Sequence, residues 1–187
     1  MLSLPCSDTL RLFFCKFEPI KQSKMKHILL IFTAALFLGS CTQNPNPTFD
    51  ANVELAKTWF STFEAEDMEA LSAMYADEVE HQGAFYGTEL MTTKDEVLAY
   101  IGGWHAAMDD ISYTPENFLP GVDPETNLPN GSVRTYGTWR ATSVASGKSF
   151  AAKFYHYMTF DENGLIINGG DYGDAMGIMM AVAPDAE

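Results

Sequence analysis

Cysteine and basic residues are scarce in this sequence. Its 187 residues include three cysteines, Cys6, Cys15 and Cys41, all in the first quarter. No disulfide, thiol nucleophile or cysteine metal cluster is therefore expected in the part of the chain beyond Cys41. The 11 Lys and Arg residues stand against 25 Asp and Glu, a formal net charge of −14. Nucleic acid is not an expected partner, because phosphate contacts need clustered Lys and Arg.

A metal motif and a membrane-spanning run are also lacking. His81, His105 and His156 are scattered along the chain and form no His-x-x-x-His pair, so no metal and no cofactor are expected. The apolar run ILLIFTAALFL, residues 28–38, is much shorter than the roughly 20 residues that cross a bilayer. A simple transmembrane anchor is therefore not expected.

The start of the chain has the pattern of a secretory signal. A basic start at residues 25–27 precedes the apolar run, and LGSC, residues 38–41, follows it. LGSC resembles the lipobox of bacterial lipoproteins, which implies acylation of Cys41 after removal of residues 25–40. The other interpretation is a signal that is uncleaved, or cleaved conventionally, with an incidental cysteine. Residues 1–24 lack an apolar core and are predicted to be a start-site extension ahead of Met25.

The mature chain would be more acidic than the whole. Residues 1–40 hold five of the Lys and Arg residues and two of the Asp and Glu residues, which leaves 6 basic against 23 acidic side chains. An anionic membrane surface would repel such a domain, so a lipid on Cys41 would have to hold it there. We expect a protein of the bacterial cell envelope, facing the periplasm or the exterior. Residues 41–52, polar and proline-containing, are predicted to be its tether.

The domain itself, residues 53–183, is predicted to begin with helices. Apolar residues recur at helical spacing from Val53 and again from Met68, with a polar break at residues 64–67. Thr93 and Glu96 form a capping-box pattern that starts a further helix. Gly102 and Gly103 lie inside it and should weaken it or end it early.

Extended segments follow. Residues 111–119 read as a strand in which Pro115 excludes a central ladder position. Residues 132–144 and 148–160 alternate between apolar and polar, and Asn163-Gly164 is a strong turn signal before a last strand at 165–171. Residues 79–82 are predicted to be a first short strand. This order favours an α+β fold, a curved antiparallel sheet wrapped around helices.

Two segments carry a family resemblance. MYADEV at residues 74–79, after an aromatic helix and a short Asp67-x-x-x-Leu71 segment, resembles the opening of the nuclear-transport-factor-2-like superfamily, in particular its SnoaL-like branch. DENGLIINGGDYGDAMGIMM, residues 161–180, resembles its closing strand, two aspartates three apart and a small helix. The resemblance implies a cone-shaped fold around an apolar pocket, and we expect a small apolar molecule as its ligand. The side chains expected to line this pocket are Trp59, Phe63, His81, Phe154, Met158 and Met176.

Three residues are candidates for acid–base chemistry in that pocket. His156 shares a strand face with Phe154 and Met158, so it should point inward, as a general base or acid or as an ordinary core histidine. The resemblance to SnoaL-like cyclases implies an aspartate as acid/base. Asp171 is placed for that role through the alternation of Leu165, Ile167 and Gly169, whereas Asp174 either acts there or caps the last helix.

A ketosteroid-isomerase type of site fits this sequence worse. In the resemblance its tyrosine donor aligns with Trp59, which has no phenol, and its aspartate aligns near Gly83, with His81 and Gln82 as the nearest polar groups. Steroid-type isomerisation is therefore not expected.

Three classes of function remain open from the sequence. The first is a membrane-tethered binding protein for a small hydrophobic molecule. The second is a cyclase, isomerase or dehydratase in which His156 and Asp171 converge on one cavity. The third is a non-catalytic module that dimerises through the outer sheet face, where Tyr136, Thr138, Tyr155 and Tyr157 would lie.

Overall fold

The computed structural model describes residues 47–185. The predicted extension, signal peptide and Cys41 all lie outside these residues. The first described helix, α2 (Pro47–Glu64), begins inside the segment predicted to be a tether. Two contacts explain the earlier start, because Phe49 packs against the core and the Asn52 side chain donates to the carbonyl of Gly131 at 2.7 Å. Proline also suits the first turn of a helix, where its missing N–H costs nothing.

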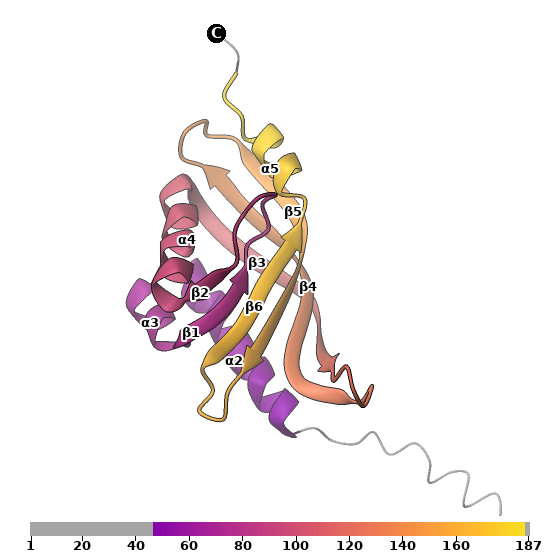
Figure 1. The fold of residues 1–187 in the computed structure, drawn as a ribbon. Helices are drawn as coiled ribbons and strands as arrows, with labels where there is room; N and C mark the ends of the chain where they lie inside the picture. Colours follow the sequence, from indigo (N-terminus) through magenta and orange to yellow (C-terminus); the bar gives the residue numbers. More distant parts are fainter. Residues whose placement is uncertain (1–46, 186–187) are drawn as a thin grey trace, which may run out of the picture. The chain divides into compact units, whose positions relative to one another are not determined.

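Two more helices precede the main strands. Helix α3 (Met68–Ala73) begins with Asp67 as its cap, and α4 (Lys94–Ala107) begins with the predicted capping box of Thr93 and Glu96. Gly102 and Gly103 do not end α4, which continues to Ala107. Figure 1 shows α2, α3 and α4 on the same side of the sheet. None of the helices within residues 47–185 is long and apolar enough to cross a membrane.

Six strands form one curved sheet, as expected for an α+β fold. They are β1 (Tyr75–Gln82), β2 (Met91–Thr93), β3 (Met108–Val122), β4 (Pro129–Ser143), β5 (Ser149–Phe160) and β6 (Ile166–Gly173). Their spatial order is β2-β1-β6-β5-β4-β3. Neighbouring strands are antiparallel except β1 and β6, which run parallel and depart from the purely antiparallel prediction. Strand β2 was not predicted.

The sheet positions follow from local sequence. Pro115 lies in β3, an edge strand of the sheet, where a missing backbone donor is tolerated. The turn between β5 and β6 falls at the predicted Asn163-Gly164. There Gly164 has a φ of 81°, which glycine adopts without a steric penalty, and the Asp161 side chain accepts from the amides of Asn163 and Leu165.

The core is aromatic where α2 meets the sheet. Phe60 stacks on Tyr113 with ring centroids 4.1 Å apart, and Phe63 lies 5.1 Å from Trp139. These rings come from one face of α2 and the inner faces of β3 and β4. The packing fixes the helix over the concave face, and the space left between them is the cavity described next.

Candidate functional site

A small aromatic cavity lies between the helices and the inner face of the sheet. Its volume is about 50 Å³, whereas pockets for drug-sized ligands measure several hundred. Aromatic rings dominate its lining, together with a few aliphatic side chains. The polar groups that line it include His81, Tyr100, His156 and Asp171. The aromatic residues are Trp59, Phe63, Tyr100, Trp104, Trp139, Phe150 and Phe154.

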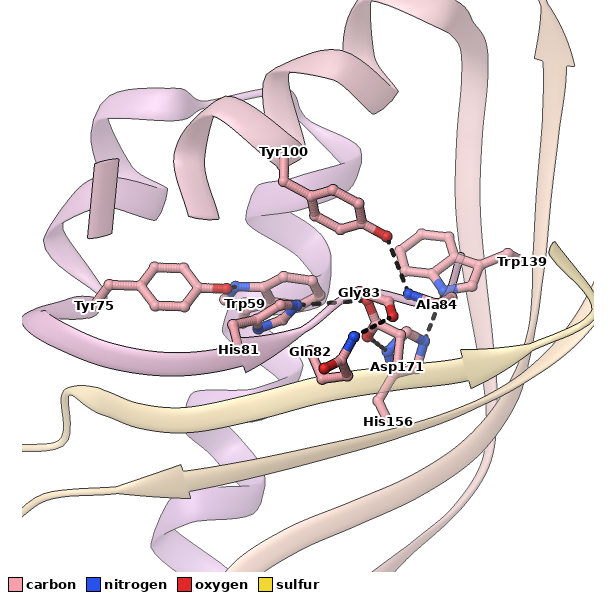
Figure 2. Close-up of polar contacts among 10 residues, drawn as sticks. All are labelled: Trp59, Tyr75, His81, Gln82, Gly83, Ala84, Tyr100, Trp139, His156 and Asp171. Atoms are coloured by element: carbon pink, nitrogen blue, oxygen red, sulfur yellow. Dashed lines mark hydrogen bonds and ion pairs between the residues drawn. The ribbon is translucent and has the colours of Figure 1, made fainter. Parts of the chain in front are cut away.

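His156 and Asp171 face each other across two neighbouring strands. They are directly paired in the register of β5 and β6, and Nδ1 of His156 lies 2.5 Å from Oδ1 of Asp171. The His156 side chain is buried, and that of Asp171 is 15% exposed. The structure therefore brings together at the cavity the two residues predicted to converge there. Figure 2 shows this contact with its neighbours.

A β-bulge brings Asp171 to the inner face. Phe160 pairs with Ile166 and Thr159 pairs with Asn168, so Ile167 is an extra residue without an opposite partner. Ile166 is buried, whereas Ile167 is exposed. The prediction that Ile167 points inward is therefore wrong. The extra residue changes the phase, so that Gly169 and Asp171 face inward after it.

Trp139 fixes the protonation of His156. Its indole Nε1 donates to Nε2 of His156 at 2.7 Å, and an indole N–H can only donate. Nε2 of His156 must therefore be unprotonated, and the ring proton is assigned to Nδ1, which donates to the Asp171 carboxylate. Both ring nitrogens are then engaged, and His156 orients Asp171 rather than presenting a free base to the cavity.

His81 approaches the other oxygen of the same carboxylate. Its Nε2 lies 3.6 Å from Oδ2 of Asp171, and its Nδ1 has no hydrogen-bond partner among residues 47–185. His81 pairs with Gly169 in the parallel register of β1 and β6. A Cβ at Gly169 would lie 3.2 Å from Nδ1 of His81, so the glycine leaves room for the imidazole.

Asp171 is held as an anion. Burial raises the pKa of the Asp171 carboxyl, but its interactions with His156 and His81 outweigh burial and hold that pKa below its usual range. A carboxylate of this kind is a firm negative charge at neutral pH. Its low pKa also makes it a weak proton acceptor in the resting site.

Tyr100 is a cavity residue that sequence reasoning missed. Its hydroxyl oxygen accepts from the amide of Ala84 at 3.4 Å, and burial together with the charge of Asp171 raises its pKa. The phenol is therefore neutral and has a proton to donate. Tyr100 follows Val97 by three residues on the apolar side of α4, and this helical spacing is the signal that could have found it.

Trp59 is not a donor to the cavity. Its Nε1 donates to the hydroxyl of Tyr75 at 2.9 Å, and burial holds the pKa of Tyr75 well above its usual range. The position that the resemblance aligns with the isomerase tyrosine thus donates its N–H within the core (Figure 2).

Four of the six residues predicted to line the pocket do line the cavity, and two do not. Trp59, Phe63, His81 and Phe154 line the cavity as predicted. Two predicted lining residues do not: Met158 is buried in the core outside the cavity lining, and Met176 is 69% exposed because it lies on the outer side of α5 (Ala175–Ala181).

Asp174 caps α5, with its Oδ1 accepting from the amide of Gly177 at 2.7 Å. It does not line the cavity. In residues 47–185, no three His, Cys, Asp or Glu side chains are grouped to hold a metal ion.

Comparisons with known proteins agree with the fold. The family described as "SnoaL-like domain" matches residues 56–168. A comparison with curated proteins gives no match.

Solved structures share the fold. A protein from Jannaschia sp. CCS1, assigned as a SnoaL-like polyketide cyclase, has a TM-score of 0.63 at 15% identity, over 77% of this chain and 100% of that one. A nuclear-transport-factor-2-like protein of unknown function from Burkholderia pseudomallei has a TM-score of 0.59 at 22% identity, over 71% and 97%.

A third similar structure has a ketosteroid-isomerase-like fold. It is a protein from Catenulispora acidiphila in complex with trimethylamine, with a TM-score of 0.58 at 12% identity, over 71% of this chain and 94% of that one. These neighbours share the architecture described above, and the family match covers more than half of the chain. The chain therefore belongs to the SnoaL-like domain family.

Proposed function

We propose that this domain binds a small molecule in its aromatic cavity, with Asp171 as the group that meets the ligand. The observation that carries this proposal is the carboxylate itself. A charged group beside an apolar cavity is costly unless it is paired. Here His156 is hydrogen-bonded to the carboxylate and His81 approaches it, while Trp139 holds His156 in place. Such an arrangement is expected where a ligand uses the charge.

The ligand is small. One water molecule needs about 10–15 Å³ of such space, so a cavity of about 50 Å³ accommodates only a few non-hydrogen atoms. The complex of the Catenulispora acidiphila protein with trimethylamine supports a ligand of that size for this fold. A polycyclic substrate would require the helices to move away from the sheet.

A fragment screen by ligand-observed NMR tests the proposal. Wild-type protein is expected to bind fragments of a few heavy atoms. The variant Trp139→Phe, which removes the donor to His156, should change the binding of those fragments. Asp174→Asn is the matched control, since asparagine caps a helix as well as aspartate and the residue is outside the cavity. If no fragment binds, or if each binds equally to a variant whose cavity is filled by Ala141→Phe, the proposal is wrong.

A second function is favoured by one observation. Asp171 and the Tyr100 hydroxyl both line the cavity. Asp171 is a weak proton acceptor in the resting site, but the neutral Tyr100 donor would acidify the carbon next to a bound carbonyl group, and the carboxylate could then accept a proton from that carbon. This is the pair that a cyclase, isomerase or dehydratase would use. In this case His156 positions Asp171 through its Nδ1–H.

Carbon-acid exchange tests this second function without a known substrate. A panel of small ketones and 1,3-dicarbonyl compounds is incubated in D₂O, and loss of the α-proton signal is followed by NMR. Catalysis predicts exchange above background that falls by about 10²–10⁴-fold in Asp171→Asn and is unchanged in Asp174→Asn. Exchange that is equal in wild type and Asp171→Asn would exclude Asp171 as the base.

A further inference from the structure

We propose that the cavity selects a small organic cation, an alkylammonium ion whose charge is met by Asp171 and whose alkyl groups lie against the aromatic rings. This inference rests on the proposed function, since it names the chemical class of the ligand in the same cavity. It narrows the earlier expectation of a purely apolar ligand.

The negative charge of Asp171 at the cavity is not balanced by a Lys or Arg side chain of the described residues. The ion-pair partners of Asp171 in residues 47–185 are His156 and His81, with no Lys or Arg. Trp139 keeps Nε2 of His156 unprotonated, so His156 is a neutral donor while that hydrogen bond holds. Within residues 47–185 the carboxylate thus has two histidines as partners, but no Lys or Arg whose positive charge would be permanent.

The basic side chains of the described domain are engaged elsewhere. Four lysines make ion pairs with carboxylates that are mostly well exposed. Arg134 interacts with Tyr155 on the outer sheet face, and Arg140, although it contributes to the lining, donates its Nη1 to Thr114 at 3.2 Å. The lysine pairs are Lys57–Glu54, Lys94–Asp77, Lys148–Asp185 and Lys153–Glu116. None of these side chains pairs with Asp171, so a cation from solution could occupy that position.

The aromatic side chains that line the cavity also favour a cation. Rings from α2, α4, β4 and β5 line the cavity, among them Trp59, Trp104, Trp139 and Phe154. The face of an aromatic ring carries partial negative charge and attracts a nearby cation, most strongly when water is excluded. Aromatic walls and a carboxylate act in the same direction on a cation, whereas a neutral apolar ligand would gain from the walls alone.

One oxygen of the Asp171 carboxylate can still accept a hydrogen bond. Oδ1 of Asp171 accepts from Nδ1 of His156, whereas among the described residues Oδ2 has only His81 at 3.6 Å, which is beyond a normal hydrogen bond. Oδ2 can accept an N–H from a protonated amine. With about 50 Å³ of space, the amine carries only short alkyl groups.

Three probes of similar size and different charge test the proposal. They are trimethylammonium, neutral tert-butanol and anionic pivalate, titrated at neutral pH into the full domain and followed by protein-observed NMR. Trimethylammonium should bind at least about tenfold more tightly than tert-butanol, since a charged hydrogen bond and cation–π contact together exceed that ratio. Pivalate should not bind.

Two variants separate charge from packing. Asp171→Asn should reduce trimethylammonium binding to the level of tert-butanol and leave tert-butanol unchanged. Phe150→Leu keeps the carboxylate and removes one ring, so it should weaken trimethylammonium by a few fold with little effect on tert-butanol. Asp174→Asn should bind all three probes as wild type does.

The outcomes are distinguishable from failure of the proposed function. Equal binding of trimethylammonium and tert-butanol in the cavity overturns the cation inference while small-molecule binding stands. Tighter pivalate binding overturns it as well. Absence of binding by any probe, together with a negative fragment screen, overturns both.

Discussion

At the scale of single residues, the two histidines that flank Asp171 have different roles. His156 is saturated by Trp139 on one side and Asp171 on the other, so its position is fixed. His81 has a nitrogen without a partner among the described residues and a long contact to the carboxylate. We infer that His156 is the positioning residue and that a ligand displaces or engages His81 more readily.

Asp171 should stabilise the fold in a pH-dependent way. Burial raises its pKa and the histidines lower it further than burial raises it, so the folded pKa lies below the unfolded one. A depressed folded pKa contributes stability above the unfolded pKa, near the model-compound value of 3.8, and this contribution is lost as pH falls through the folded pKa. Each unit of lowering is worth about 1.4 kcal/mol.

Urea unfolding of wild type and Asp171→Asn between pH 7 and pH 3 measures that contribution. The wild-type advantage in unfolding free energy should be largest near neutral pH and shrink below about pH 4. Other carboxylates also have pKa values lowered by hydrogen bonds, but they are present in both proteins. Their contribution to the pH dependence therefore cancels when the two unfolding free energies are subtracted. These exposed residues are Asp77, Glu96, Asp123 and Asp161. A difference that does not vary with pH would contradict this assignment.

At the scale of secondary-structure elements, the bulge in β6 makes a clear prediction. Ile166 is fully buried, so Ile166→Ala should cost about 2–4 kcal/mol of unfolding free energy through lost burial and a new cavity. Ile167 is exposed at the bulge, so Ile167→Ala should change stability by less than about 0.5–1 kcal/mol. Chemical denaturation of this matched pair checks the register, and the reverse order of the two effects would contradict it.

The same strand shows how far sequence reasoning reaches. Alternation places His156 correctly because β5 is regular along its pairing with β4. Alternation from Ile167 reaches Asp171 because two features that the local sequence pattern does not report offset each other. The inward residue is Ile166 rather than Ile167, and the bulge inserts one residue after it. Bulges depend on pairing between strands, which local periodicity does not report.

Other features depend on tertiary contacts in the same way. The early start of α2 is stabilised by Asn52 bonding to Gly131, a residue 79 positions away. Short β2 is held by pairing with β1. Capping signals are local, by contrast, and those at Thr93 and Asp174 were both recognisable in the sequence.

At the scale of the whole molecule, the outer face of the sheet carries a cluster of four tyrosines. Tyr136, Tyr155, Tyr157 and Tyr172 lie there with ring centroids 5–6 Å apart, and Tyr136 and Tyr172 are exposed. Such rings are enriched in protein interfaces. We propose that this tyrosine face joins two copies of the chain.

Analytical ultracentrifugation tests the dimer proposal. Wild type should sediment as a dimer and Tyr155→Glu as a monomer, because a carboxylate would be buried without a partner in the interface. Tyr86→Glu is the control, since Tyr86 is fully exposed and takes no part in the ring contacts of the four tyrosines. A monomeric wild type, or a dimeric Tyr155→Glu, would contradict the proposal.

Attachment to the envelope is the last question at this scale, and it depends on Cys41, outside the described residues. Beyond residue 40 the chain has 6 basic and 23 acidic side chains, so electrostatics would repel it from an anionic bilayer. We therefore propose that a covalent lipid on the cysteine attaches the protein to the membrane. Cys41→Ser should move the protein from the membrane fraction to the soluble fraction in cell fractionation. A high-salt wash should not release the wild-type protein, because salt screens charge attraction but leaves acyl chains in place. If Cys41→Ser stays with the membranes, the lipoprotein proposal fails, and if high salt alone releases the wild type, a basic surface on a partner holds it instead.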